Sequence, residues 1–239
     1  MVKMFAVFLL CVFTFQTQVI ADDLDDISIY TEDYPPYNYR AKSGQLQGIA
    51  VTLLTESYRH ANASFDKDRI KLRSWDKGYQ ALLDNPNTML FSMTRTPERE
   101  NLFKWVGPIS DTKIVLLAKK SSGIKIQEKS DISKYIIGGI RNDIGLSLAE
   151  ELIANKGQIR DFSSATAIAK MLNLGRIDLW AYEENVALDF LQSLNLNTSD
   201  FEAVYTLSRS QLYYAFNIDT QQKIIDDLQQ KLDAFRLIK

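Results

Sequence analysis

The sequence has almost none of the residues that would cross-link it or hold a transition metal. Its 239 residues include one cysteine, Cys11, and one histidine, His60. A single cysteine cannot form a disulfide within the chain, so a disulfide-stabilised scaffold is excluded. His60 has polar neighbours and no cluster of His, Cys or carboxylate side chains nearby, so its surroundings fit no metal site. We expect no metal and no other cofactor, and a fold that depends on its hydrophobic core.

An excess of positive charge and repeated or biased segments are also absent. The 28 Lys and Arg residues are balanced by 30 Asp and Glu residues, which gives a formal net charge of −2. Nucleic-acid binding usually needs a clustered basic surface, and this balance gives no reason to expect a nucleic-acid partner. A basic patch that would bind a membrane surface is not visible either. We expect a monomer that binds a small molecule.

No hydrophobic run is long enough to cross a membrane. The apolar run after Lys3 covers residues 4–13, whereas a spanning helix needs about 20 apolar residues. A short positive start, an apolar segment and small-residue chemistry at 19–21 are typical of a secretory signal peptide. We predict a signal peptide at 1–21, cleaved after about Ala21, and a periplasmic mature protein without cysteine. A buried N-terminal helix is the alternative.

The residues that follow alternate between strand and helix patterns. Short apolar or alternating runs predict strands, and apolar residues at helical spacing predict amphipathic helices. Two rounds of this alternation favour an α/β fold of two doubly wound lobes, in which ligands lie beyond the carboxyl ends of the strands. The expected strands are 27–31, 70–73, 89–93, 114–118, 135–140, 176–182 and 201–207, and the expected helices are 49–61, 75–83, 144–153, 165–174 and 224–235.

Polar side chains follow the apolar strand at 89–93. Thr94 and Arg99 come next, and Pro97 predicts a helical turn with Thr96 as its N-cap, because proline at the first helical position leaves no N–H unpaired. A strand end beside a helix N-terminus favours an anion. The guanidinium of Arg99 matches a carboxylate bidentately and stays charged. We expect Arg99 to bind an anionic group; an arginine that caps a surface helix is the alternative.

This segment resembles the extracytoplasmic solute-binding proteins of family 3, the amino-acid-binding group of ABC importers. The family shows a strand, then Ser-x-Ser/Thr-x-Thr-x-x-Arg, then an exit strand ending in proline. Ser92, Thr94, Thr96, Arg99 and residues 105–108 stand at those positions. The resemblance implies that Arg99 binds the ligand's α-carboxylate.

The resemblance covers nearly all of residues 22–239. It implies a type II periplasmic-binding-protein-like fold, in which two crossover segments join the lobes around a ligand cleft. Residues 211–217 resemble the family's return crossing. Lobe one is then 22–112 with 208–239, and lobe two is 113–207.

Aromatic positions of lobe one also match the family. Tyr34 and Tyr37 stand at the aromatic positions of a Pro-containing loop, and Trp75 stands where the family stacks an aromatic side chain on the ligand. In the family, the position of Tyr34 lies against the ligand. Thr52 departs from the pattern, because the family usually has Asp there. The alternatives are that both tyrosines only pack the loop and that Trp75 belongs to the core.

Lobe two is expected to complete the site. Asp143 is a suitable N-cap after the strand at 135–140, and in the family this turn points backbone N–H groups at the ligand carboxylate. Asn142 replaces a frequent Gly there, and Arg141 either reads an acidic group of the ligand or is solvated. Glu183 replaces the Asp that binds the ligand's ammonium in the family. Alternatively, Glu183 only begins the next helix, where an acid suits the dipole.

The resemblance implies an exported protein that captures a small zwitterionic or carboxylate solute, amino-acid-like, and delivers it to an ABC-importer permease. Two other functions stay open. An enzyme similar to the cyclohexadienyl dehydratases would need a general acid or base in the cleft, and Glu183 is the candidate. A ligand-sensing module would work with a separate signalling partner. We expect binding without catalysis.

Overall fold

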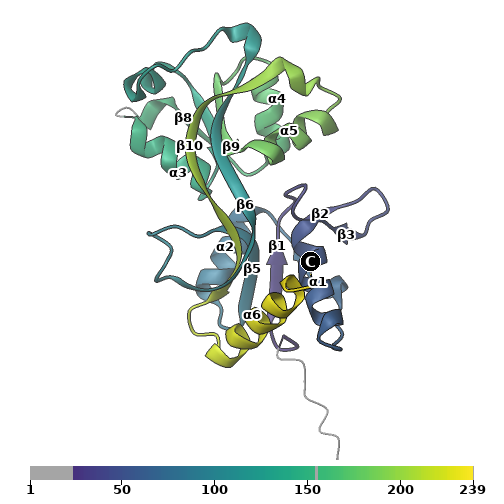
Figure 1. Cartoon of the computed structure of the whole chain (residues 1–239). Coiled ribbons are helices and arrows are strands. Elements are labelled where there is room, and N and C mark those ends of the chain that lie inside the picture. Colours follow the sequence, from purple (N-terminus) through teal and green to yellow (C-terminus); the bar gives the residue numbers. More distant parts are fainter. Residues whose placement is uncertain (1–23, 154–155, 239) are drawn as a thin grey trace, which may run out of the picture.

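The computed structural model describes residues 24–153 and 156–238. They form two lobes, one above the other in Figure 1, which share an eight-stranded sheet of order β4-β1-β5-β10-β6-β9-β7-β8. The predicted signal peptide at 1–21 lies outside the described residues. Within the described ranges, no helix has the length and apolar character that a membrane span requires.

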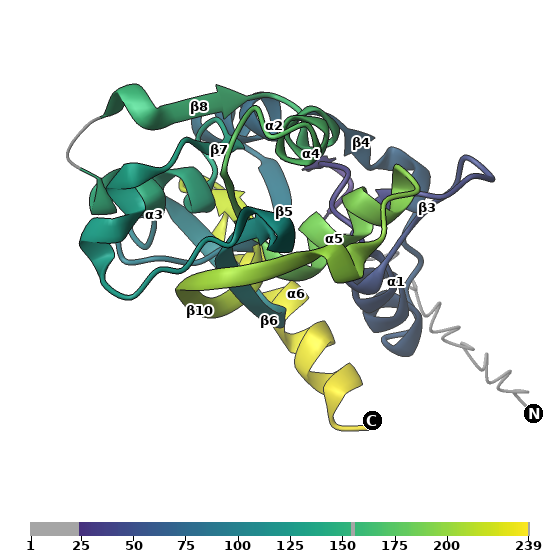
Figure 2. The ribbon, with the colours of Figure 1, turned by 90° about the horizontal axis from the view of Figure 1, so that it is seen from above.

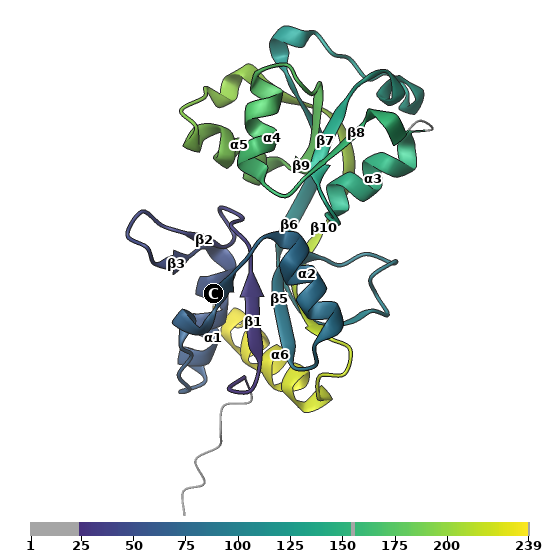
Figure 3. The ribbon, with the colours of Figure 1, turned by 180° about the vertical axis from the view of Figure 1, so that it is seen from behind.

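Lobe one is built on parallel strands with helices on both faces. Strand β1 (Ser28–Thr31) pairs with β4 (Lys71–Leu72) and with β5 (Thr88–Thr94). Successive residues of β5 point to opposite faces, so Met89 and Phe91 pack with α1 and α6 while Leu90 packs with α2. Figure 3 shows α2 in front of these strands and α6 behind them. The remaining elements are α1 (Ile49–His60), α2 (Trp75–Asp84), α6 (Gln222–Arg236) and the hairpin of β2 (Tyr39–Arg40) and β3 (Leu46–Gln47).

Lobe two repeats this arrangement. Strand β7 (Ile137–Ile140) pairs in parallel with β8 (Ile159–Phe162) and with β9 (Leu179–Glu183). Helix α3 (Ile144–Leu152) covers one face of the sheet, and α4 (Ala165–Asn173) and α5 (Glu184–Ser193) cover the other (Figure 2). Short 3-10 helices occupy Lys67–Arg69, Lys120–Ser122, Lys129–Lys134, Lys156–Gln158 and Thr198–Asp200.

Two long strands run through both lobes. Strands β6 (Phe103–Lys119) and β10 (Phe201–Asn217) pair antiparallel with each other along their length. In lobe one β10 also pairs with β5, and in lobe two β6 also pairs with β9. The expected two-lobed α/β fold with two crossover segments is confirmed. The proposed lobe limits, at 112/113 and 207/208, fall inside these two strands.

The sequence pattern misplaced two local features. The turn expected to be helical at Pro97 contains an i→i+3 bond, in which the amide of Arg99 donates to the carbonyl of Thr96 at 3.1 Å, and it does not become a helix. The strands expected at 114–118 and 201–207 are the ends of β6 and β10. Each of these strands supplies backbone partners to the other across the polar stretch between the lobes, which a local pattern does not reveal.

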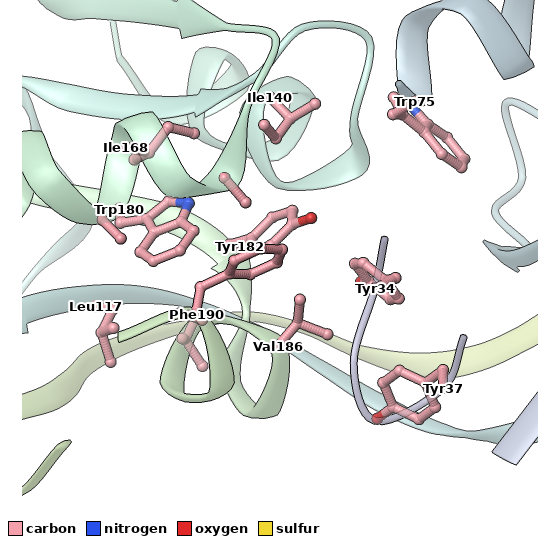
Figure 4. Packing of buried hydrophobic residues seen from close by; sticks show 14 of the residues in the cluster. Tyr34, Tyr37, Trp75, Leu117, Ile140, Ile168, Trp180, Tyr182, Val186 and Phe190 are labelled. Atoms are coloured by element: carbon pink, nitrogen blue, oxygen red, sulfur yellow. The ribbon is translucent and has the colours of Figure 1, made fainter. Parts of the chain in front are cut away.

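One hydrophobic cluster crosses from lobe one to lobe two. It is distinct from the clusters under α1 and α6 and under α3, each of which stays within one lobe. The two lobes therefore pack against each other, and the surface between them contains both aromatic and charged groups. The residues shared across the boundary include Tyr34, Tyr37 and Trp75 from lobe one and Ile140, Tyr182, Val186 and Phe190 from lobe two (Figure 4).

Candidate ligand-binding site between the lobes

Three hydrogen bonds join the lobes around the predicted site residues. The indole N–H of Trp75 donates to the carbonyl of Asn142 at 3.0 Å, and Nη2 of Arg99 donates to the same oxygen at 3.1 Å. The hydroxyl of Tyr37 donates to Oε1 of Glu183 at 3.2 Å. These hydrogen bonds connect the two lobes, so the residues that make them lie at the boundary between the lobes.

Arg99 is buried at this boundary, with 7% of its surface exposed. Its guanidinium carbon lies 5.7 Å from the ring centre of Trp75 and 5.3 Å from that of Tyr79, and Nη1 donates to the carbonyl of Thr94 at 3.4 Å. Aromatic faces attract a guanidinium at such distances. A cavity of about 290 Å³ borders Arg99 and has walls from α2 and α3. The cation thus faces the space between the lobes.

Ser92 and Thr94 are buried near the end of β5. Ser92 has a φ of 63°, in the left-handed region, and its hydroxyl donates to the side-chain oxygen of Asn38. Asn38 in turn donates to the carbonyl of Glu32 at 2.8 Å. These bonds tie the 32–38 loop to β5, so Ser92 positions the loop that carries Tyr34.

Gly48 fixes the other side of this loop. It precedes α1 with a φ of 126°, and a Cβ built on it would lie 2.6 Å from the carbonyl carbon of Tyr37 and 2.8 Å from the amide nitrogen of Asn38. Only glycine allows this backbone angle and this approach. The position of Tyr37 opposite Glu183 therefore depends on Gly48.

Asp143 caps α3, as the sequence predicted. Its carboxylate accepts from the amide of Gly145 at 2.9 Å. Burial raises the pKa of Asp143, while the bond from Gly145 and the positive charge of Arg99 lower it. The positive charge of Arg99 in lobe one therefore acts on the carboxylate of Asp143 in lobe two.

Glu183 is fully buried and caps α5. Its Oε2 accepts from the amide of Val186 at 2.8 Å, and its Oε1 accepts from Asn185 and Tyr37, both at 3.2 Å. Desolvation raises its pKa, and these hydrogen bonds oppose the rise. The helix-starting role considered for Glu183 is therefore present, alongside a direct contact with lobe one.

Tyr34 lies against two other tyrosines. Its ring centre is 5.6 Å from that of Tyr37 and 5.6 Å from that of Tyr182, which it meets edge-on. Trp75 stacks on Tyr79 at 5.7 Å. Tyr182 stacks on Trp180, and its oxygen points toward the loop of Tyr34 (Figure 4). Aromatic side chains of both lobes therefore line the boundary.

A second cavity, of about 330 Å³, lies between the lobes on the side of β4 and β8. Of the predicted ligand-binding residues, Trp75 is the one in its lining. The sequence reasoning missed Glu32, which lies in this lining directly after β1. The other lining residues are Asp33, Leu72, Arg73 and Ser74 of lobe one and Ile140, Ser163, Ser164, Ala165, Thr166 and Phe190 of lobe two.

Arg141 is not in the lining of the boundary cavities that border Trp75 and Arg99. Its Nε donates to the carboxylate of Asp161 at 2.6 Å, and about half of each side chain is exposed. This is the solvated arrangement that the sequence reasoning held open. The ligand-reading role of Arg141 stays a prediction.

Comparison with known proteins identifies the family of this chain. The model of the bacterial extracellular solute-binding proteins, family 3, matches residues 27–235. No curated protein matches the sequence.

Several solved structures share the fold. The arginine-, lysine-, histidine-binding protein ArtJ from Geobacillus stearothermophilus has a TM-score of 0.74 at 19% identity, over 89% of this chain and 90% of that one. The arginine-bound form of truncated ArgBP from T. maritima has a TM-score of 0.72 at 19% identity, over 91% and 98%. A histidine kinase sensor domain with similarity to periplasmic binding proteins has a TM-score of 0.76 at 15% identity, over 90% and 92%. The chain belongs to family 3 of the bacterial extracellular solute-binding proteins.

Proposed function

We propose that this protein is an exported binding protein that captures a small amino-acid-like or carboxylate solute between its lobes and delivers it to an ABC-importer permease. The mature protein then works in the periplasm as a monomer. The observation that carries the proposal is the buried guanidinium of Arg99 at the boundary of the two lobes. Family membership supports it, as do solved neighbours that bind arginine, lysine or histidine.

The ligand's carboxylate binds Arg99 in this proposal. Nη2 of Arg99 now donates to the neutral carbonyl of Asn142, and a carboxylate is the stronger acceptor because charge-assisted bonds are about twice as strong as neutral ones. Thr94, whose carbonyl holds Nη1, and Ser92 position this end of the site.

The ligand's ammonium lies toward the carboxylates of Asp143 and Glu183 in lobe two. Tyr34 and Trp75 supply aromatic faces to the remainder of the ligand. A solute that contacts both lobes stabilises the closed arrangement by those contacts, and it enters when the lobes separate about β6 and β10.

Titration calorimetry on residues 22–239 tests the proposal with a panel of amino acids and organic acids. We expect micromolar binding of at least one solute and its loss in Arg99→Ala. The matched control is Arg59→Ala, which removes an exposed arginine that pairs with Glu56 on α1. Unchanged affinity in Arg99→Ala would refute the assignment.

Signal sensing is the second candidate, because a histidine kinase sensor domain shares this fold. Capture of a ligand is common to both functions, and the genetic neighbourhood separates them: a permease gene supports import, and a receptor gene supports sensing. Catalysis has less support, because both carboxylate oxygens of Glu183 already accept hydrogen bonds.

A further inference from the structure

One backbone oxygen of lobe two accepts two hydrogen bonds from lobe one. The indole N–H of Trp75 reaches the carbonyl of Asn142 at 3.0 Å, and Nη2 of Arg99 reaches the same oxygen at 3.1 Å. A carbonyl oxygen has two lone pairs, so these two donors saturate it. Figure 4 shows the indole of Trp75 opposite Ile140 of lobe two, with its nitrogen on that side. Trp75 and Arg99 are both buried, so water competes little for their N–H groups.

A tight turn directs this oxygen toward lobe one. The amide of Asp143 donates to the carbonyl of Ile140 at 3.1 Å, which makes residues 140–143 a β-turn. Asn142 is the third residue of the turn and has a φ of 60°, in the left-handed region that asparagine tolerates better than most residues. Asn142 itself is exposed. Its contribution to the boundary is therefore the direction of its carbonyl.

The same oxygen occupies one end of the guanidinium that the solute needs. Both terminal nitrogens of Arg99 donate to protein carbonyls, Nη1 to that of Thr94 at 3.4 Å and Nη2 to that of Asn142. A carboxylate binds a guanidinium through two parallel hydrogen bonds. A carboxylate that binds this end of Arg99 must therefore replace the carbonyl of Asn142.

We propose that the carbonyl of Asn142 competes with the solute for Arg99, and that Asn142 is thereby a positioning residue that sets solute affinity. The contact favours closure of the lobes, and the solute's carboxylate must displace it in order to bind. Apparent affinity falls with the fraction of molecules whose binding groups are free. The inference rests on the proposed function where it concerns affinity, whereas its effect on closure can be measured with no solute added.

Distances between spin labels test the effect on closure. Residues 22–239 contain no cysteine, so cysteines introduced at Asp84 in α2 and at Gln192 in α5, both exposed, carry one label on each lobe. Trp75→Phe keeps an aromatic ring and removes the N–H donor. We expect the ratio of closed to open molecules to fall about fivefold, because one neutral hydrogen bond is lost. Trp105→Phe is the matched control, because its indole N–H donates to the carbonyl of Glu100 within lobe one.

Two substitutions at Asn142 test the role of its backbone. Alanine disfavours the left-handed region, whereas glycine adopts it without strain. We expect Asn142→Ala to open the lobes and to bind a solute of the amino-acid and organic-acid panel up to about fivefold tighter in titration calorimetry. Asn142→Gly should keep the distances and the affinity of the unmodified protein. A general loss of structure in Asn142→Ala would weaken binding instead.

The outcomes separate this inference from the proposed function. Unchanged distances in Trp75→Phe or in Asn142→Ala would overturn the inference. Loss of binding in Arg99→Ala together with unchanged or weaker binding in Asn142→Ala would leave the proposed function intact and overturn the competition. If no panel member binds the unmodified protein, the proposed function fails together with the competition, and the distances still decide whether the contact closes the lobes. Urea unfolding shows that each variant is folded before it is labelled or titrated.

Discussion

The hydrogen bond between Tyr37 and Glu183 should decide how readily the lobes separate. Tyr37→Phe removes the hydroxyl and keeps the ring that packs on Tyr34. The lost bond spans 3.2 Å from lobe one to a buried carboxylate, and the pKa of Tyr37, raised to about 12 by burial and by Glu183, keeps it a donor at neutral pH.

The size of the effect follows from the acceptor. Hydrogen bonds to charged groups contribute about 1.5–3 kcal/mol. Because Glu183 keeps its hydrogen bonds from Val186 and Asn185 when the Tyr37 hydroxyl is removed, we expect a loss at the lower end of that range. About 1.4 kcal/mol corresponds to a tenfold change in an equilibrium constant. We therefore expect the ratio of closed to open molecules to fall about tenfold in Tyr37→Phe.

Distance measurements between spin labels can follow this ratio. Residues 22–239 contain no cysteine, so in that part of the chain cysteines introduced at Asp84 at the end of α2 and at Gln192 on α5, both exposed, give one label on each lobe. Tyr39→Phe is the control, because Tyr39 bonds to Gln47 outside the boundary. Identical distance distributions in the unmodified protein and Tyr37→Phe would show that this bond does not hold the lobes together.

Three further predictions concern stability, measured by urea unfolding. Gly48→Ala should cost about 1–3 kcal/mol, because alanine disfavours the φ of 126° and its Cβ meets the Tyr37 backbone; stability equal to that of the unmodified protein would contradict this. Arg141→Ala should leave stability within error, because its ion pair with Asp161 is exposed. The ligand-free protein should lose stability as pH rises above the ordinary glutamate range, by up to about 1.4 kcal/mol per pH unit. Burial raises the pKa of Glu32. Glu32 therefore holds its proton to a higher pH in the folded state than in the unfolded chain, so the folded state binds more protons between the two pKa values. Glu32→Gln removes this group and should therefore reduce the change of the unfolding free energy with pH.

The features that depend on local sequence were predictable. The alternation of strand and helix patterns gave the α/β fold, and Asp143 was identified as a cap from its place before an apolar helix. The motif around Arg99 led to the family, which the match over residues 27–235 confirms. These signals need only neighbouring residues or a known motif.

The features that depend on how the lobes meet were not predictable. Glu32 and Tyr182 are ordinary residues in the sequence. They become informative because the fold places Glu32, half-buried, in a cavity lining and buries the hydroxyl of Tyr182 without a hydrogen-bond partner. A signal for Tyr182 did exist, since it lies two residues after Trp180 and therefore on the same face of β9. Glu32 offered only its position after β1, where ligands of such sheets gather.

The pairing of β6 with β10 restricts how the protein can move. The two strands stay hydrogen-bonded from Phe201 opposite Lys119 to Asn217 opposite Phe103, with register shifts near Ala203, Thr206 and Leu212. Sliding one strand along the other would break the whole ladder, whereas twisting the pair as a ribbon preserves it. Opening is thus reduced to a rotation with few degrees of freedom, and each reclosure brings the same side chains back into register.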